Sequence, residues 1–223
     1  MQKSAYLKQS AVLSVIAFIL LMIAFSVGQF ASPGAGQEQF EYIYALEKYV
    51  SNLVGAEPAL RTVLFFDALF ALCYTAAICF AILGFASRNM PVAWFCGLGI
   101  LSVMGLDYWE NITMVQSLDL AAIEGGMTQE RVVYLATVSA VKWHTSAAVL
   151  FAISFLLPRK TLAELLLVWG TRLGLAIAVP LFVVNAFDMR EMASWMILMS
   201  MGSGFVLLAL VAWQNARETE AAE

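Results

Sequence analysis

Three polar residues stand close together inside one long apolar stretch of the chain, and their types can bind a cation or carry a proton. Asp107, Glu110 and Asn111 are spaced i, i+3 and i+4, so on a helix their side chains share one face. Two carboxylates this close repel each other, which favours the uptake of a proton by one of them. The pattern therefore predicts a cation or proton site.

Ionisable residues in other apolar stretches could complete this site. Asp67, Lys142 and Arg172 each stand well inside such a stretch. At the centre of a membrane helix each costs about 2.5–3.5 kcal/mol on insertion scales, so each needs a partner or a function. Helix rise and the length of the basic side chains predict that all these groups can meet. The predicted ligand or proton site holds three carboxylates and two cations: Asp67, Asp107, Glu110, Asn111, Lys142 and Arg172.

Large side chains beside these residues are candidates for the wall of a pocket. Trp109 and Trp143 adjoin the acidic pair and Lys142 in the chain, and Met114 follows about one helical turn later. Tryptophan also anchors helices at membrane interfaces and methionine fills irregular cores, so plain packing remains the alternative. His144 is two residues from Lys142, about 200° around a helix, and is expected to point elsewhere.

The elements that must position these residues are long apolar helices. The chain of 223 residues is 62% hydrophobic and 13% charged, with a mean hydropathy of +0.82. A soluble domain needs more charge to cover its surface, and apolar runs of about 18 residues or more can cross a bilayer. We predict an all-α polytopic membrane protein, a single bundle over residues 1–223 with six transmembrane helices at about 11–28, 60–86, 91–117, 130–157, 161–184 and 190–213.

The longest polar stretch, residues 29–59, separates the first two predicted spans. Apolar residues recur in it at helical spacing, with charged residues between them: Phe40, Ile43, Tyr44, Val50 and Leu53. This pattern predicts an amphipathic interfacial helix at about residues 37–54, which either lies on the membrane surface or caps the bundle. Gly55 can end this helix, and Pro58 suits the first turn of the next one.

The basic residues beside the helix ends predict the orientation in the membrane. One set of connections and termini holds Lys3, Lys8, Arg88, Arg159, Lys160 and Arg217, and the other set holds Lys48, Arg61, Arg131 and Arg190. Short cytoplasmic loops carry the excess of basic residues. We therefore predict a multi-pass protein of the cell (inner or plasma) membrane with both termini in the cytoplasm and the charged cluster in the outer half of the bundle.

Several classes of function are not expected. No basic stripe is present, so nucleic acid is not an expected partner. The three cysteines and the single histidine do not form a set of metal ligands, and we expect neither a metal nor another cofactor. The chain has no G-x-S-x-G or H-E-x-x-H motif. Whether the protein is an enzyme stays open, and no catalytic residue is assigned.

Three hypotheses remain. The first is the binding or transport of a small amphipathic molecule or lipid, with Lys142 pairing with an anionic group while Asp107 and Glu110 bind a cation or carry a proton. The second is a membrane-embedded lipid-modifying enzyme with one of these acids as a general base. The third is a structural or accessory subunit whose charges only set helix packing. Membrane lipids are expected partners, and an oligomer or a partner subunit stays open.

Overall fold

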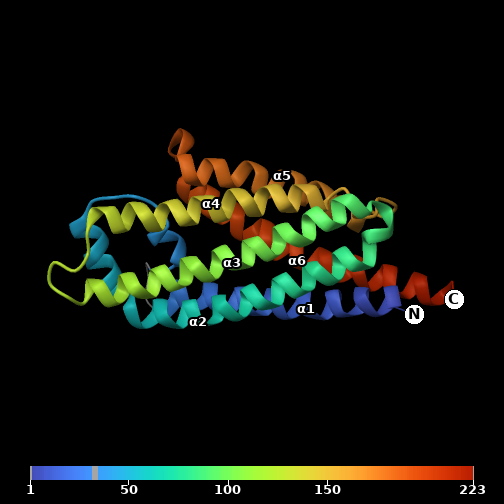
Figure 1. Ribbon diagram of the computed structural model, residues 1–223, viewed down its shortest axis with the longest axis horizontal. Coiled ribbons are helices and arrows are strands. Elements are labelled where there is room, and N and C mark those ends of the chain that lie inside the picture. The colour runs from blue at the N-terminus through green and yellow to red at the C-terminus, as the bar shows by residue number, and fades with distance from the viewer. Residues whose placement is uncertain (1, 32–34, 223) are drawn as a thin grey trace.

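The computed structural model describes residues 2–31 and 35–222, and all the regular structure in these residues is helical. Six long helices run along the molecule (Figure 1): α1 (Gln2–Ser26), α2 (Leu46–Phe85), α3 (Met90–Ala121), α4 (Gln129–Ile153), α5 (Leu162–Val184) and α6 (Arg190–Ala221). Four short helical turns accompany them: η1 (Val27–Ala31), η2 (Gln37–Phe40), η3 (Ala86–Arg88) and η4 (Ala186–Asp188). All six long helices are long and apolar enough to cross a membrane, which confirms the helical part of the prediction.

The six helices form a closed ring. Each long helix packs against the next one in the chain, and α1 also packs against α6. Successive helices run in opposite directions, so both termini lie at one end of the molecule (Figure 1). We call this end the terminal end. The opposite end, which holds residues 35–45, the α3–α4 connection and η4, is the distal end.

Local signals set several helix ends. The Thr128 hydroxyl accepts a hydrogen bond from the Arg131 backbone N–H at 3.3 Å, so Thr128 caps the start of α4. Thr161 and Glu164 form a capping box at the start of α5. Such side chains satisfy backbone N–H groups that have no partner within the helix. These bonds depend only on residues three apart, and the predicted helix starts at 130 and 161 agree with those of α4 and α5 to within one residue.

The structure does not confirm a separate interfacial helix at about residues 37–54. Residues 46–54 form the first turns of α2, which continues through Pro58 to Phe85, so Pro58 does not start a new helix. A proline removes one backbone hydrogen bond, to the carbonyl four residues earlier. That carbonyl belongs to Val54, a residue near the distal end that is 48% exposed. The lost bond therefore falls where the helix is open to its surroundings, and α2 remains continuous.

The apolar face of this segment packs inside the protein. Phe40, Tyr49 and Leu53 are completely buried. They belong to a core at the distal end that includes Leu60, Met114 and Leu135. The Tyr49 hydroxyl donates a hydrogen bond to the Phe40 carbonyl oxygen at 3.0 Å. An apolar stripe has the same spacing whether it faces lipid or a protein core, and in this chain it faces the core.

Candidate functional site

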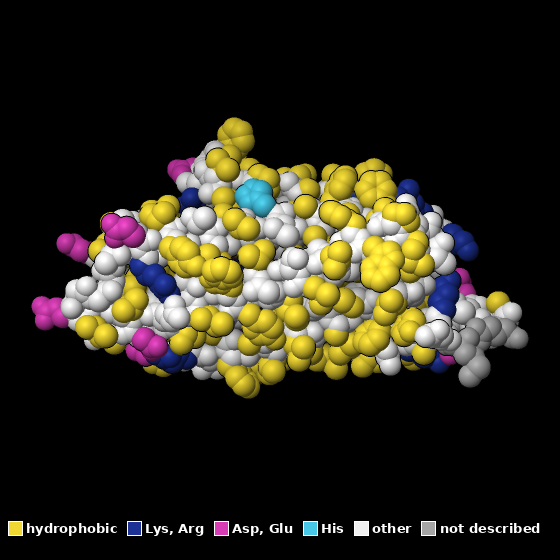
Figure 2. Space-filling view, viewed as in Figure 1, with side chains coloured by type: hydrophobic (Ala, Val, Ile, Leu, Met, Phe, Trp, Pro, Cys, Tyr) yellow, Lys and Arg dark blue, Asp and Glu magenta, His cyan; other side chains and the backbone are white. Residues whose placement is uncertain are grey.

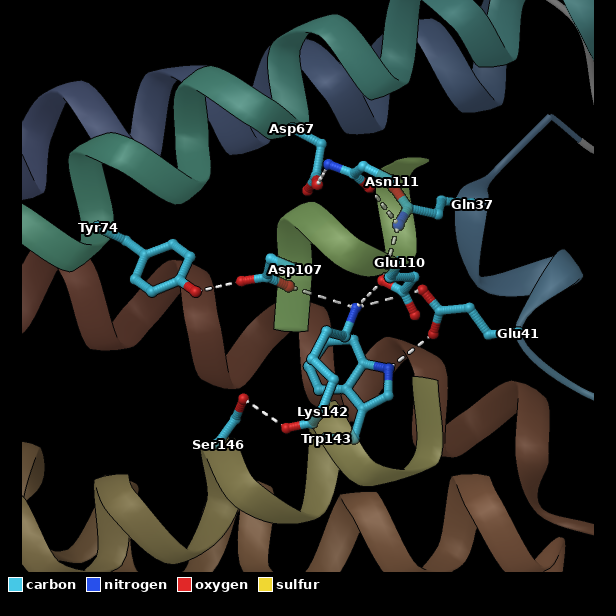
Figure 3. A network of polar contacts seen from close by, with 10 residues as sticks. All are labelled: Gln37, Glu41, Asp67, Tyr74, Asp107, Glu110, Asn111, Lys142, Trp143 and Ser146. Carbon is cyan, nitrogen blue, oxygen red and sulfur yellow. Dashed lines mark hydrogen bonds and ion pairs between the residues drawn. The ribbon is translucent and has the colours of Figure 1, made fainter. Parts of the chain in front are cut away.

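Lys142 of α4 lies at the centre of a buried polar cluster (Figure 3). Its side chain is 6% exposed. The Lys142 Nζ forms a close ion pair with Glu110 Oε2 of α3, and it lies 3.6 Å from Asp107 Oδ1 and 3.6 Å from Glu41 Oε1. The ammonium also lies 4.4 Å from the centroid of the Trp143 ring. Three carboxylates and an aromatic face thus surround one positive charge.

A chain of amides joins this centre to α2. The Gln37 Nε2 donates to Glu110 Oε2 at 3.1 Å and to Asn111 Oδ1 at 3.3 Å. The Asn111 Nδ2 donates in turn to Asp67 Oδ2 at 2.7 Å. The i, i+3, i+4 face of α3 therefore does carry Asp107, Glu110 and Asn111 into one network, and this network reaches Asp67.

Two neutral side chains donate hydrogen bonds to the carboxylates of Asp107 and Glu41. The Tyr74 hydroxyl of α2 donates a short hydrogen bond to Asp107 Oδ2, and the Trp143 Nε1 donates to Glu41 Oε2 at 2.6 Å. Asp107 therefore lies between Tyr74 and Lys142, while Glu41 lies between Lys142 and Trp143 (Figure 3). Each of these carboxylates accepts a hydrogen bond from a neutral donor and lies within ion-pair distance of Lys142, which together fix its orientation.

Residues 35–45, which we call the re-entry segment, bring two of these side chains in from the distal end. The segment folds back against η1 where two glycines meet, since a Cβ on Gly28 would lie 3.2 Å from the Gly36 Cα. From there Gln37 and Glu41 point into the ring and are 8% and 6% exposed. Non-helical backbone is tolerated inside a membrane protein where it is buried or lines a cavity.

The cluster holds more negative than positive groups. The sequence predicted three carboxylates with two cations, but the structure gathers four carboxylates and one cation: Glu41, Asp107 and Glu110 lie within ion-pair distance of Lys142, and Asp67 joins them through Asn111. Burial is the main reason that the pKa of Glu41 rises to about 8; the Glu110 carboxylate also raises it, while the Lys142 ammonium and the Trp143 N–H oppose the rise. Glu41 is therefore suited to hold a proton near neutral pH.

One oxygen of the cluster has no partner. Glu110 is completely buried, and its Oε1 accepts no hydrogen bond from any residue that the structure describes. A buried acceptor without a donor is costly, by about 1–3 kcal/mol or more for a charged group. The Glu110 Oε1 is thus a place where an added hydrogen-bond donor would be stabilised.

Arg172 does not join the cluster, and the prediction that it would was wrong. Its Nε donates to the Ser154 Oγ at 2.9 Å, beyond the last residue of α4 at the terminal end. Its guanidinium also stacks on Phe155 and Trp169, at 4.7 Å and 5.2 Å from their ring centroids. The depth of Arg172 along α5 allowed its side chain to extend either toward the carboxylates or toward the terminal end. The Ser154 hydroxyl and the two aromatic rings stabilise it at the terminal end.

Of the three predicted wall residues, only Trp143 takes part in the cluster. Trp109 is 55% exposed and donates its Nε1 to the Tyr134 hydroxyl at 2.9 Å on the outside of the ring. Trp109 is two residues after Asp107, about 200° around the helix, so it points away from the face that holds Asp107, Glu110 and Asn111. Met114 is completely buried, but it packs in the distal core. His144 lies on the outer face, as expected, with its Nδ1 2.8 Å from the Ala140 carbonyl oxygen.

Sequence reasoning missed Gln37, Glu41 and Tyr74. Tyr74 is seven residues after Asp67, which is two helical turns, so the shared face of α2 could have revealed it. Gln37 and Glu41 looked like the polar face of a surface helix. Only the fold of the re-entry segment shows that both are buried.

The cluster forms part of the wall of a cavity of about 960 Å³ inside the ring. At its distal end the cavity is lined by Glu38, Glu41, Asp188 and Arg190, and in the middle by Asp67, Asp107, Lys142 and Trp143. Toward the terminal end its lining is apolar and includes Leu157, Leu167 and Leu208. The volume is at the upper end of the range of about 300–1,000 Å³ found for small-molecule sites.

This fold and site define a class of protein: an all-helical ring of six potential membrane spans around an amphipathic cavity, with a lysine-centred charge cluster in the cavity wall. Comparison of the chain with protein-family models, with curated proteins and with solved structures finds no match.

Proposed function

We propose that the protein is a membrane protein that binds a small amphipathic molecule or lipid in the central cavity and can serve in its transport. The polar head would lie against the charged cluster, and the apolar part would extend toward Leu167 and Leu208. The observation that carries the proposal is the cavity of about 960 Å³, which is charged at one end and apolar at the other. Such a gradient matches a molecule with a head and a tail.

Proton coupling is part of this proposal. Glu41 faces the cavity, and its pKa of about 8 lies close to physiological pH. The groups that set its protonation are Glu110 of α3, Lys142 and Trp143 of α4, and Glu38 of its own segment. A ligand that disturbs any of these contacts would change the proton affinity of Glu41, so binding and protonation would be linked.

A structural role for the charges is the second candidate, and a specific observation favours it. The cluster ties the re-entry segment to α3 and α4 through Lys142 and to α2 through Asn111. Such a network of ion pairs and hydrogen bonds can fix helix packing without binding a ligand. If the charges only fix helix packing, a substitution that fills the cavity away from the cluster will leave the activity of the protein unchanged.

The test of binding uses a glycine in the cavity wall. Gly204 of α6 lines the cavity, and a Cβ built on it meets no atom within 4 Å. We expect Gly204→Phe to abolish saturable binding of radiolabelled dodecyltrimethylammonium, dodecanoate or dodecanol to the protein in nanodiscs, with empty nanodiscs subtracted. The phenyl ring would occupy the space that the dodecyl chain needs.

The matched control is Gly105→Phe. Gly105 also has nothing within 4 Å of a built Cβ, but it lies on the exposed side of α3 and is not among the residues that line the cavity. This variant should bind like the wild type. Saturable binding of none of the three compounds, or binding that Gly204→Phe leaves unchanged, would rule out the cavity as the binding site.

We further propose that the terminal end faces the cytoplasm, so that the cluster lies in the outer half of the membrane. Charged side chains lie mainly at the two ends of the molecule, on either side of a broad apolar zone (Figure 2). The basic residues Arg88, Arg159 and Lys160 follow helix ends at the terminal end, and such residues favour the cytoplasmic side. A fluorescent protein fused to the C-terminus should fluoresce, and alkaline phosphatase fused there should be inactive. The reverse result would invert the proposed orientation.

A further inference from the structure

The charged side chains that line the cavity are mostly acidic. The acidic ones are Glu38, Glu41, Asp67, Asp107, Asp188 and Glu191, and the basic ones are Lys142 and Arg190. A cavity with walls of low dielectric constant concentrates the field of such groups. Unless protons or a bound cation neutralise them, the excess negative charge is costly in a buried site.

Both basic side chains are already engaged. Lys142 is held by three carboxylates, and its ammonium lies against the Trp143 ring. Arg190 donates its Nε to the Phe182 carbonyl oxygen at 3.1 Å, and its guanidinium lies 4.2 Å from the centroid of the Tyr42 ring. An anionic ligand would have to displace carboxylates from Lys142, so the expected pairing of Lys142 with an anionic group loses its support.

The carboxylates of Asp67 and Asp107 are the ones best placed for a ligand. Asp67 receives a hydrogen bond from the Asn111 amide, and within residues 2–31 and 35–222 no basic side chain lies within ion-pair distance of it. Asp107 is 13% exposed and lies 3.6 Å from Lys142 Nζ. Figure 3 shows both carboxylates pointing toward the same region, Asp67 from α2 and Asp107 from α3.

Two other features of the site favour a cation. Aromatic rings line the same cavity on several sides: Tyr42, Phe70, Tyr74, Trp143 and Trp195. Aromatic faces attract ammonium groups by about 0.5–2 kcal/mol, most strongly where water is excluded. In addition, the buried Glu110 Oε1 beside Lys142 lacks a hydrogen-bond donor among the residues described, so the cluster as a whole can accept a further donor or positive charge.

From these observations we infer that the ligand head group is a cation, and that the cavity takes an amphipathic amine or quaternary ammonium compound, with the cation at Asp67 and Asp107 and the tail in the apolar part. This inference rests on the proposed binding function. It names the charge of the ligand, which the cavity volume alone leaves open.

The test compares three probes that share one tail. Dodecyltrimethylammonium, dodecanol and dodecanoate have the same alkyl chain and carry a positive, a neutral and a negative head. We expect the cation to bind the wild-type protein in nanodiscs at least about tenfold more tightly than the anion, because the carboxylates attract one head and repel the other at low dielectric constant. Asp67→Asn and Asp107→Asn should each weaken binding of the cation and leave binding of dodecanol unchanged.

The control variant is Asp119→Asn. Asp119 is also on α3, but its side chain is 62% exposed and pairs with Arg61 at 2.6 Å outside the cavity, so cation binding should be unaffected. If Asp107→Asn does not fold, Asp67→Asn and the three-probe comparison on the wild type decide alone. If all three compounds bind with equal affinity and Gly204→Phe abolishes this binding, the binding function is retained but the proposed cationic head group is wrong. Saturable binding of none of them would overturn both.

Discussion

Replacing Lys142 with Met is expected to destabilise the protein by about 3–5 kcal/mol, the range for removing one partner of a buried ion pair. Methionine has a similar length but no charge. It would leave Glu41, Asp107 and Glu110 close together and buried without the ammonium that now holds them. Reversible unfolding by a denaturing detergent, followed by circular dichroism, measures this loss.

Two further variants show whether the lost charge is the cause. Lys48→Met removes a lysine that lies exposed in the first turn of α2, and it should change stability little. The double variant Lys142→Met/Glu110→Gln should recover part of the loss, because one uncompensated carboxylate has been removed as well. A loss below about 1 kcal/mol for Lys142→Met, or no recovery in the double variant, would mean that the cluster does not depend on its central cation.

The second large effect concerns the pH dependence of stability. The pKa of Glu41 is raised from 4.5 to about 8 in the folded protein. Between these values the folded state keeps a proton that the unfolded state has released, so rising pH favours unfolding. The contribution of Glu41 to stability is fully present below about pH 4.5 and is lost as the pH rises toward 8. The slope approaches about 1.4 kcal/mol per pH unit within this window.

Glu41→Gln should remove this pH dependence. Glutamine stays neutral at every pH and keeps an oxygen that can accept the hydrogen bond of Trp143. We therefore expect the variant to match the wild type near pH 4.5 and to be more stable than it at pH 8, by on the order of 4 kcal/mol. Detergent-induced unfolding at a series of pH values measures the difference between the two proteins.

Glu47→Gln serves as the control for this experiment. Glu47 is an exposed acid in the first turn of α2, close in the chain to Glu41, and its substitution should leave the pH profile unchanged. A difference between Glu41→Gln and the wild type that stays constant from pH 4.5 to 8 would show that Glu41 remains ionised in the native protein. In that case the proposed link between proton and ligand would lose its proton site.

The sequence predicted most of the helices well and one connection poorly. The positions of α3 to α6 follow from local features, such as the caps at Thr128 and Thr161 and the long apolar runs between them. These features act over three or four residues and need no knowledge of the fold. The start of α2 and the path of residues 35–45 depend on which surface receives Phe40, Tyr49 and Leu53, and that is decided by packing against α3 and α4.

The candidate site shows the same division. That Asp107, Glu110 and Asn111 share one face, and that Lys142 needs a carboxylate partner, follow from helix geometry and from the cost of a charge in an apolar environment. The first expectation involves residues of one helix, and the second only the need of a buried ammonium for a negatively charged partner. The rotation of each helix about its axis was not accessible in this way, which is why Arg172 was misplaced. The outward direction of Trp109, by contrast, follows from its spacing from Asp107 on α3.

By itself, the sequence determined that this chain forms long apolar helices and that a few ionisable groups inside them must find partners, because both follow from composition and from spacing along one helix. Only the tertiary structure decided that, among residues 2–31 and 35–222, Lys142 would be the one cation in a cluster of four carboxylates. It also decided that Glu41 and Gln37 would enter from the distal end and that a cavity would remain inside the ring. The reason is physical. Closing six helices into a ring sets how each one is turned, and that rotation decides which side chains face one another.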